Sequence, residues 1–139
     1  MTSGCLPITL DPLVLTPALD HVKFLKLAEV LARKASLGEK CGNLYGAVIV
    51  QKSDGHVIAE GYDSTCIDPT GTAGISAIRT ASRLLQTANL SGCVMYLNVY
   101  PPFIDSFAIL NANIRDVYYI GDTQVKTKFN QTTYHPVQV

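Results

Sequence analysis

The distribution of apolar and polar residues divides the chain into helical and extended segments. From Asp20 to about Ser36, apolar side chains recur at spacings of three and four, which predicts an amphipathic helix with Asp20 as its N-cap. Two further helices are predicted, one over about residues 75–85 and one from Pro102 to about Asn111. Runs rich in β-branched and aromatic residues predict four strands, at 46–50, 56–62, 94–99 and 114–120.

The two ends of the chain carry weaker patterns. Three prolines interrupt residues 1–19, which predicts an irregular N-terminal arm before a domain of residues 20–139. At the other end, residues 125–131 suggest a short helix and residues 132–139 an extended tail.

The order of these elements is helix, strand, strand, helix, strand, helix, strand. A hairpin followed by strand–helix–strand units predicts an α/β fold, namely a three-layer α/β/α sandwich around a mixed central sheet. A length of 139 residues suits one such domain.

Composition narrows the possible partners. Eleven basic and eleven acidic residues cancel, so the chain has no general attraction to phosphate backbones or anionic membranes. The basic residues of the first helix, which are Lys23, Lys26, Arg33 and Lys34, fit its solvated face, and autonomous nucleic-acid binding is not expected. No apolar run is long enough to span a membrane, and the N-terminus does not fit a signal peptide. We therefore expect a soluble intracellular protein, cytoplasmic or nuclear.

The cysteines and histidines do not form an obvious metal site. None of the four cysteines has C-x-x-C spacing, and in an intracellular protein we expect their thiols to be reduced. The three histidines, His21, His56 and His135, are scattered along the chain and are expected to be surface or turn residues rather than ligands.

Five segments carry a resemblance to a known family. They are L-A-x-x-L-A-R-K-A, G-A-V-I-V with H-V-I-A-E-G-Y-D, D-P-T-G-T-A-G-I-S-A-I-R, L-S-G-C-V-M-Y-L-N-V-Y-P-P-F-I-D and I-R-D-V-Y-Y-I-G-D. In this order and at near-family spacing they resemble the cytidine and deoxycytidylate deaminase superfamily, including the tRNA adenosine deaminases, over residues 22–122. The resemblance implies the deaminase fold.

The resemblance also implies where the catalytic residues should stand. The family holds a water-activating zinc ion with one His or Cys and two Cys, and a nearby Glu moves the proton. Here the His position is Thr72, the Glu position is Gly74, and the two Cys positions are Pro102 and Asp105. A threonine hydroxyl is a poor zinc ligand, and neither proline nor glycine offers a side-chain donor. We therefore predict that zinc is absent and that the four positions are degenerate.

The altered cleft has two possible states. Two helix N-termini are expected to meet there, so that water, an anion or the Asp105 carboxylate fills the space. The bulk of Pro102 and Phe103 instead favours closure by apolar packing. If the cleft is open, the possible pocket residues are Asp68, Thr72, Tyr100 and Asp105. A rebuilt metal site is a less favoured possibility, with Cys66, Asp68, Thr72 and Asp105 as candidate ligands.

The sequence thus favours a catalytically inactive deaminase-fold protein, or pseudoenzyme. Its expected role is that of a structural or regulatory subunit in a homo-oligomer, or in a hetero-oligomer with an active deaminase relative, because such deaminases commonly assemble. Two alternatives stay open: a module that binds a nucleotide or another small ligand, and a divergent CMP, dCMP or tRNA-type deaminase.

Overall fold

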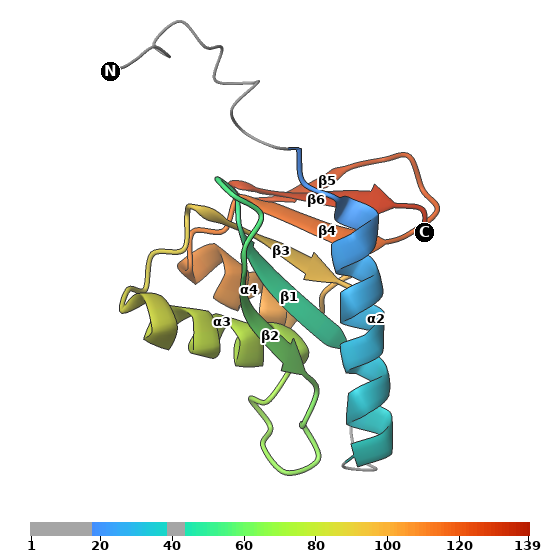
Figure 1. The fold of residues 1–139 in the computed structure, drawn as a ribbon, viewed down its shortest axis with the longest axis vertical. Helices are drawn as coiled ribbons and strands as arrows, with labels where there is room; N and C mark the ends of the chain where they lie inside the picture. The colour runs from blue at the N-terminus through green and yellow to red at the C-terminus, as the bar shows by residue number, and fades with distance from the viewer. Residues whose placement is uncertain (1–17, 39–43) are drawn as a thin grey trace, which may run out of the picture.

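The computed structural model describes residues 18–38 and 44–139 and has the predicted three layers (Figure 1). A six-stranded sheet in the order β2-β1-β3-β4-β6-β5 forms the middle layer. Helix α2 (His21–Gly38) covers one face, and helices α3 (Ala73–Leu85) and α4 (Phe103–Asn111) cover the other. The strands are β1 (Gly46–Gln51), β2 (Val57–Tyr62), β3 (Cys93–Leu97), β4 (Asp116–Ile120), β5 (Thr127–Phe129) and β6 (Thr132–Val137).

The sheet is mixed, as predicted. β1 pairs antiparallel with β2 and β3, whereas β3–β4 and β4–β6 are parallel pairs. Helix α4 connects β3 to β4, and the edge strand β5 lies between β4 and β6 along the chain. The predicted elements between residues 20 and 120 are present, with ends shifted by one to a few residues. No helix in the described part of the chain is both long and apolar enough to cross a membrane.

The C-terminal segment differs from the prediction. The expected short helix at residues 125–131 is wrong, because Thr127–Phe129 forms strand β5, which pairs with β6 across a turn at Asn130. Asn130 has a φ of 58°, a left-handed conformation that asparagine tolerates in hairpin turns. The expected extended segment at residues 132–139 is present and forms strand β6 (Thr132–Val137), which pairs with β4. The predicted N-terminal arm lies almost wholly outside the described residues.

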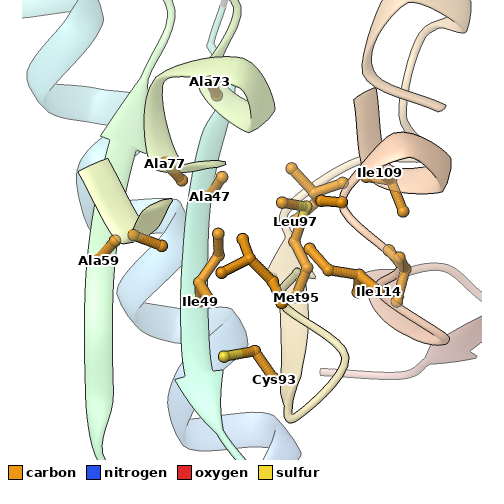
Figure 2. Close-up of a cluster of buried hydrophobic side chains, with 14 of the residues drawn as sticks. Ala47, Ile49, Ala59, Ala73, Ala77, Cys93, Met95, Leu97, Ile109 and Ile114 are labelled. Atoms are coloured by element: carbon orange, nitrogen blue, oxygen red, sulfur yellow. The ribbon is translucent and has the colours of Figure 1, made fainter. Parts of the chain in front are cut away.

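Two apolar clusters hold the layers together. The larger one joins the sheet to α3 and α4 and includes Ile49, Met95, Leu97, Ile109 and Ile114 (Figure 2). The helix α3 lies so close to β2 that a Cβ on Gly61 would be 2.5 Å from the Ala73 carbonyl oxygen. Close packing on this face therefore fixes the start of α3, which is the part of the helix that matters for the candidate site.

The other face carries a stack of aromatic rings at the start of α2. Asp20 accepts a hydrogen bond from the Lys23 amide at 3.1 Å, as expected of an N-cap. The next residue, His21, stacks on Tyr118 with ring centroids 3.9 Å apart, and Tyr118 stacks on His135 at 4.4 Å. The expectation that His21 and His135 are surface or turn residues is therefore wrong, since both rings are partly buried in this stack.

Polar contacts fix the two ends of the stack. His21 Nδ1 is 2.7 Å from the Tyr96 hydroxyl, and burial raises the pKa of Tyr96, so the hydroxyl keeps its proton and can donate it to a neutral His21 ring. His135 Nε2 is 2.8 Å from an Asp116 oxygen, and Asp116 also pairs with Lys52 at 3.6 Å. The stack thus joins the first turn of α2 to strands β3, β4 and β6.

This arrangement predicts a loss of stability in mild acid. Burial lowers the pKa of His21, repulsion from His135 lowers it further, and Asp20 opposes the shift. The unfolded chain therefore binds a proton at His21 more readily, so the free energy of unfolding falls as pH drops below about 6.5. We expect His21→Gln to reduce this pH dependence, measured by urea unfolding between pH 5 and pH 8.

His56→Gln is the matched control, because His56 is exposed on the turn between β1 and β2. It should leave the pH dependence of unfolding unchanged. An equal effect of both substitutions would contradict the role assigned to the stack.

Candidate functional site

The start of helix α3 is held by a network of short polar side chains. Thr72 is its N-cap, and the Thr72 hydroxyl accepts a hydrogen bond from the Ile75 amide at 3.2 Å. In the preceding loop, the Asp68 carboxylate accepts bonds from the Thr70 amide at 2.9 Å and the Thr70 hydroxyl at 2.8 Å. Asp68 also pairs with Arg79 at 3.6 Å. These contacts bring the chain into α3 along one defined path.

The Asp105 carboxylate lies where helices α3 and α4 both begin. Asp105 belongs to the first turn of α4, yet its carboxylate accepts hydrogen bonds from the Thr72 hydroxyl and from the Gly74 amide of α3. Asp105 is only 2% exposed and Thr72 only 6%. An anion at this point satisfies an N–H group that the first turn of α3 cannot pair internally, and it lies at the positive ends of both helix dipoles.

Gly74 leaves the space that this carboxylate occupies. A Cβ at residue 74 would lie 2.7 Å from Asp105 Oδ2, which is closer than carbon and oxygen atoms approach without displacement. The absence of a side chain at Gly74 is therefore needed for the carboxylate to sit against α3. We refer to Thr72, Gly74 and Asp105 together as the aspartate lock.

Burial and hydrogen bonding act on Asp105 in opposite directions. Burial raises the pKa of the Asp105 carboxyl, the bonds from Thr72 and Gly74 lower it, and the nearby Asp63 carboxylate raises it again. Asp63 was not predicted as a site residue, although it is 1% exposed and accepts a hydrogen bond from the Thr65 hydroxyl at 2.9 Å. Its position directly after strand β2 is a sequence signal that could have identified it. Two buried acidic residues thus contribute to the electrostatics of this region.

Pro102 and Phe103 do not close the cleft as predicted. Pro102 is the N-cap of α4 without a side-chain hydrogen bond, and its side chain is exposed. Phe103 is 81% exposed and cannot cover a buried site. The expected closure of the cleft by the side chains of Pro102 and Phe103 is therefore wrong. The buried Asp105 carboxylate fills the space between the helix starts instead.

Of the four predicted pocket residues, the structure brings Thr72 and Asp105 together. Asp68 faces Thr70 and Arg79 instead. Tyr100 is half-exposed, and its hydroxyl is 3.2 Å from Thr127 Oγ1 near the β5–β6 hairpin. These two side chains therefore make their polar contacts outside the aspartate lock.

The candidate ligands of a rebuilt metal site do not gather. Cys66 is disulfide-bonded, so the expectation of a reduced thiol is wrong for this residue and it offers no thiolate. Within residues 18–38 and 44–139, no three His, Cys, Asp or Glu side chains lie close enough together to hold a metal ion.

Comparison with known proteins identifies relatives of this chain. The family described as the cytidine and deoxycytidylate deaminase zinc-binding region matches residues 19–121. The chain is 36% identical over 106 residues to a guanine deaminase of Bacillus subtilis, which covers 75% of this chain and 66% of the relative. It is 35% identical over 98 residues to a tRNA-specific adenosine deaminase of Aquifex aeolicus, covering 69% of this chain and 62% of the relative. The chain thus spans less than two thirds of the length of these relatives.

Solved structures with a similar fold belong to the same group of proteins. A structure from a study of A-to-I editing by tRNA:A34 deaminases superposes with a TM-score of 0.64 at 38% identity, over 70% of this chain and 74% of that one. The three-layer deaminase fold expected from the sequence is therefore confirmed.

The aspartate lock predicts an unusual cost for a helix-favouring substitution. Alanine normally stabilises a helix relative to glycine by about 0.5–1 kcal/mol. Gly74→Ala should instead destabilise the protein by about 1–3 kcal/mol, because its Cβ displaces the Asp105 carboxylate. Denaturant unfolding would measure the difference.

Two comparisons make this prediction specific. Gly92→Ala should be nearly neutral, because a Cβ there meets nothing within 4 Å. In an Asp105→Ala background the contact with the carboxylate is gone, so Gly74→Ala should become neutral or stabilising. Additive effects of the two substitutions would contradict the lock.

Proposed function

The chain belongs to the cytidine and deoxycytidylate deaminase family, and we propose that within it this protein is a non-catalytic subunit. The observation that carries the proposal is the aspartate lock. Three of the four positions at which the family's pattern places its zinc ligands and proton-moving glutamate are joined here by direct contacts, and the group they enclose is the chain's own carboxylate.

The residues at these positions do not fit a zinc ion. A catalytic zinc site needs three protein ligands and one open position for water. Pro102 has no donor atom, Gly74 has no side chain, and the Thr72 hydroxyl already donates to Asp105 while it accepts from Ile75. A single carboxylate remains, and its oxygens are engaged by the start of α3. No step of a zinc-dependent deamination can therefore be assigned to these residues.

A subunit role is consistent with a protein that keeps the deaminase fold but not the family's zinc ligands and glutamate. The family's fold is retained along residues 19–121, and selection for packing alone is sufficient to retain it if the protein works through its surface. We therefore propose that the protein supports or regulates a homo-oligomer, or a hetero-oligomer with an active deaminase. A balanced charge of eleven basic and eleven acidic residues gives no support to autonomous nucleic-acid binding.

A second candidate function is a divergent deaminase acting on a purine. It is favoured by the 36% identity to a guanine deaminase and the 35% identity to a tRNA-specific adenosine deaminase. Under this alternative a carboxyl group would have to carry the proton that the glutamate carries in the family. Asp105 would be the candidate, since burial raises the pKa of its carboxyl.

Metal content and ammonia release separate the two functions. We expect the purified protein to hold far less than one zinc per chain after expression with added zinc. It should release no ammonia above background from guanine, deoxycytidylate or adenosine in tRNA. Stoichiometric zinc together with enzymatic turnover of any of these would overturn the first proposal and support the second. The Bacillus subtilis guanine deaminase serves as the positive control for guanine.

A restoring variant tests whether the lock is what excludes the metal. Thr72→His, Gly74→Glu, Pro102→Cys and Asp105→Cys together rebuild the family's pattern on this frame. We expect this variant to approach one zinc per chain, measured by elemental analysis, while Gly74→Glu alone does not. Light scattering and co-purification from the native cells test the subunit role, and a monomer that recovers no partner would contradict it.

A further inference from the structure

A pocket of about 320 Å³ lies between the start of α4 and the β5–β6 hairpin. Its walls include Tyr100, Phe103, Ser106, Lys128 and Phe129. Pro102 also lines it, but none of the three residues of the aspartate lock does, so the pocket is separate from the lock. Its volume is near the lower end of the range for small-molecule sites, which runs from about 300 to 1,000 Å³.

Three aromatic rings line this pocket, and two of them are held in place. Tyr100 makes an edge contact with Tyr119, with ring centroids 5.0 Å apart, and its hydroxyl bonds Thr127. Phe129 makes an edge contact with Phe107 at 5.3 Å. Phe103, by contrast, is exposed at the pocket's edge. This arrangement suits a flat aromatic ligand. Such a ligand can stack on the rings of Tyr100 and Phe129, which are held in place, and can cover the exposed ring of Phe103.

Polar groups of two kinds accompany the rings. Lys128 lines the pocket, and none of the described carboxylates forms an ion pair with it. Ser106, a buried residue of α4, also lines the pocket. Next to it, the buried Tyr134 hydroxyl has no hydrogen-bond partner at proper geometry among the described residues, although Ser106 is near enough to lower the pKa of Tyr134 against the effect of burial.

A buried hydroxyl without a partner costs free energy, and such groups in folded proteins call for an explanation. Here the Tyr134 ring also contacts the ring of Tyr100, a residue that lines the pocket, with centroids 5.4 Å apart. A ligand that bonds to Ser106 from the pocket would therefore bind next to this unpaired hydroxyl.

From these contacts we infer that the pocket binds a small planar aromatic molecule that carries one anionic group. The ring lies between Tyr100, Phe129 and Phe103, the anionic group meets the Lys128 ammonium, and a polar edge of the ring reaches Ser106. The inference does not depend on whether the aspartate lock is catalytic, because the two sites share no residue.

NMR titration of the full chain tests this site with two charged probes, guanosine 5′-monophosphate and 2-aminobenzoate, which distinguish a phosphate from a carboxylate. Their uncharged counterparts are guanosine and aniline. We expect a charged probe to shift the amide signals of Tyr100, Phe103, Ser106, Lys128 and Phe129 at lower concentration than its counterpart does. Lys128→Gln should weaken the charged probe about tenfold, the equivalent of one charge-assisted hydrogen bond.

Lys126→Gln is the matched control, since Lys126 is an exposed lysine of the same segment that does not line the pocket, and it should not change the affinity. Phe103→Ala should weaken all probes while the protein stays folded, because the Phe103 side chain is exposed. The inference fails if neither charged probe shifts these signals, or if Lys128→Gln and Lys126→Gln behave alike. It also fails if the signals respond to protein concentration instead, because the pocket would then receive a second copy of the chain.

Discussion

One hydrogen bond between two helix starts organises the centre of this protein. The Thr72 hydroxyl donates to the Asp105 carboxylate, and the same hydroxyl caps helix α3. Two helices that begin side by side bring their positive dipole ends and their unpaired amides together, and something negative or electron-rich has to lie between them. In this chain the required group is supplied by Asp105, which is covalently part of α4 and needs no ion from solution. The bond therefore ties α4 to α3 as well as neutralising their ends.

This constraint explains how membership of the family is compatible with the altered site that we propose. The apolar cluster under α3 and α4 depends on residues such as Ile49, Met95 and Ile109, none of which belongs to the four substituted positions. Packing can hold the two helix starts at the same spacing whichever group lies between them. A match along residues 19–121 consequently reports the fold of the family, whereas our proposal of a non-catalytic subunit depends on Thr72, Gly74, Pro102 and Asp105.

The sequence predicts the frame well and the contents of the site poorly, for physical reasons. Helical periodicity identifies elements that bury one face, such as α2 and α3, and runs rich in β-branched and aromatic residues identify the first four strands, of which β1 and β3 are buried on both faces. It failed at residues 125–131 because a three-residue strand is defined by its partner β6, and the local signal was a single asparagine, Asn130, in the turn. In the site, Pro102 and Phe103 looked like covering residues because they are apolar. Which way a side chain points from the first turn of a helix depends on the neighbouring helix, and here Asp105 turns inward while Phe103 turns out.

Helix α4 shows most clearly the consequence of Asp105 pointing inward and Phe103 pointing outward. Its buried residues include the polar Asp105 and Ser106, whereas Phe103, Ile104 and Phe107 are exposed, which reverses the usual arrangement of a surface helix. The inward polar residues are accounted for on one side by the start of α3, because it offers donors to Asp105. On the other side Ser106 faces a buried tyrosine hydroxyl that has no partner at hydrogen-bond geometry among the described residues. The cost of exposing three large apolar side chains is therefore balanced only in part by contacts within the described chain. Of the three, Phe103 lines the pocket at Lys128, so a ligand bound there would bury apolar surface that the folded chain leaves exposed.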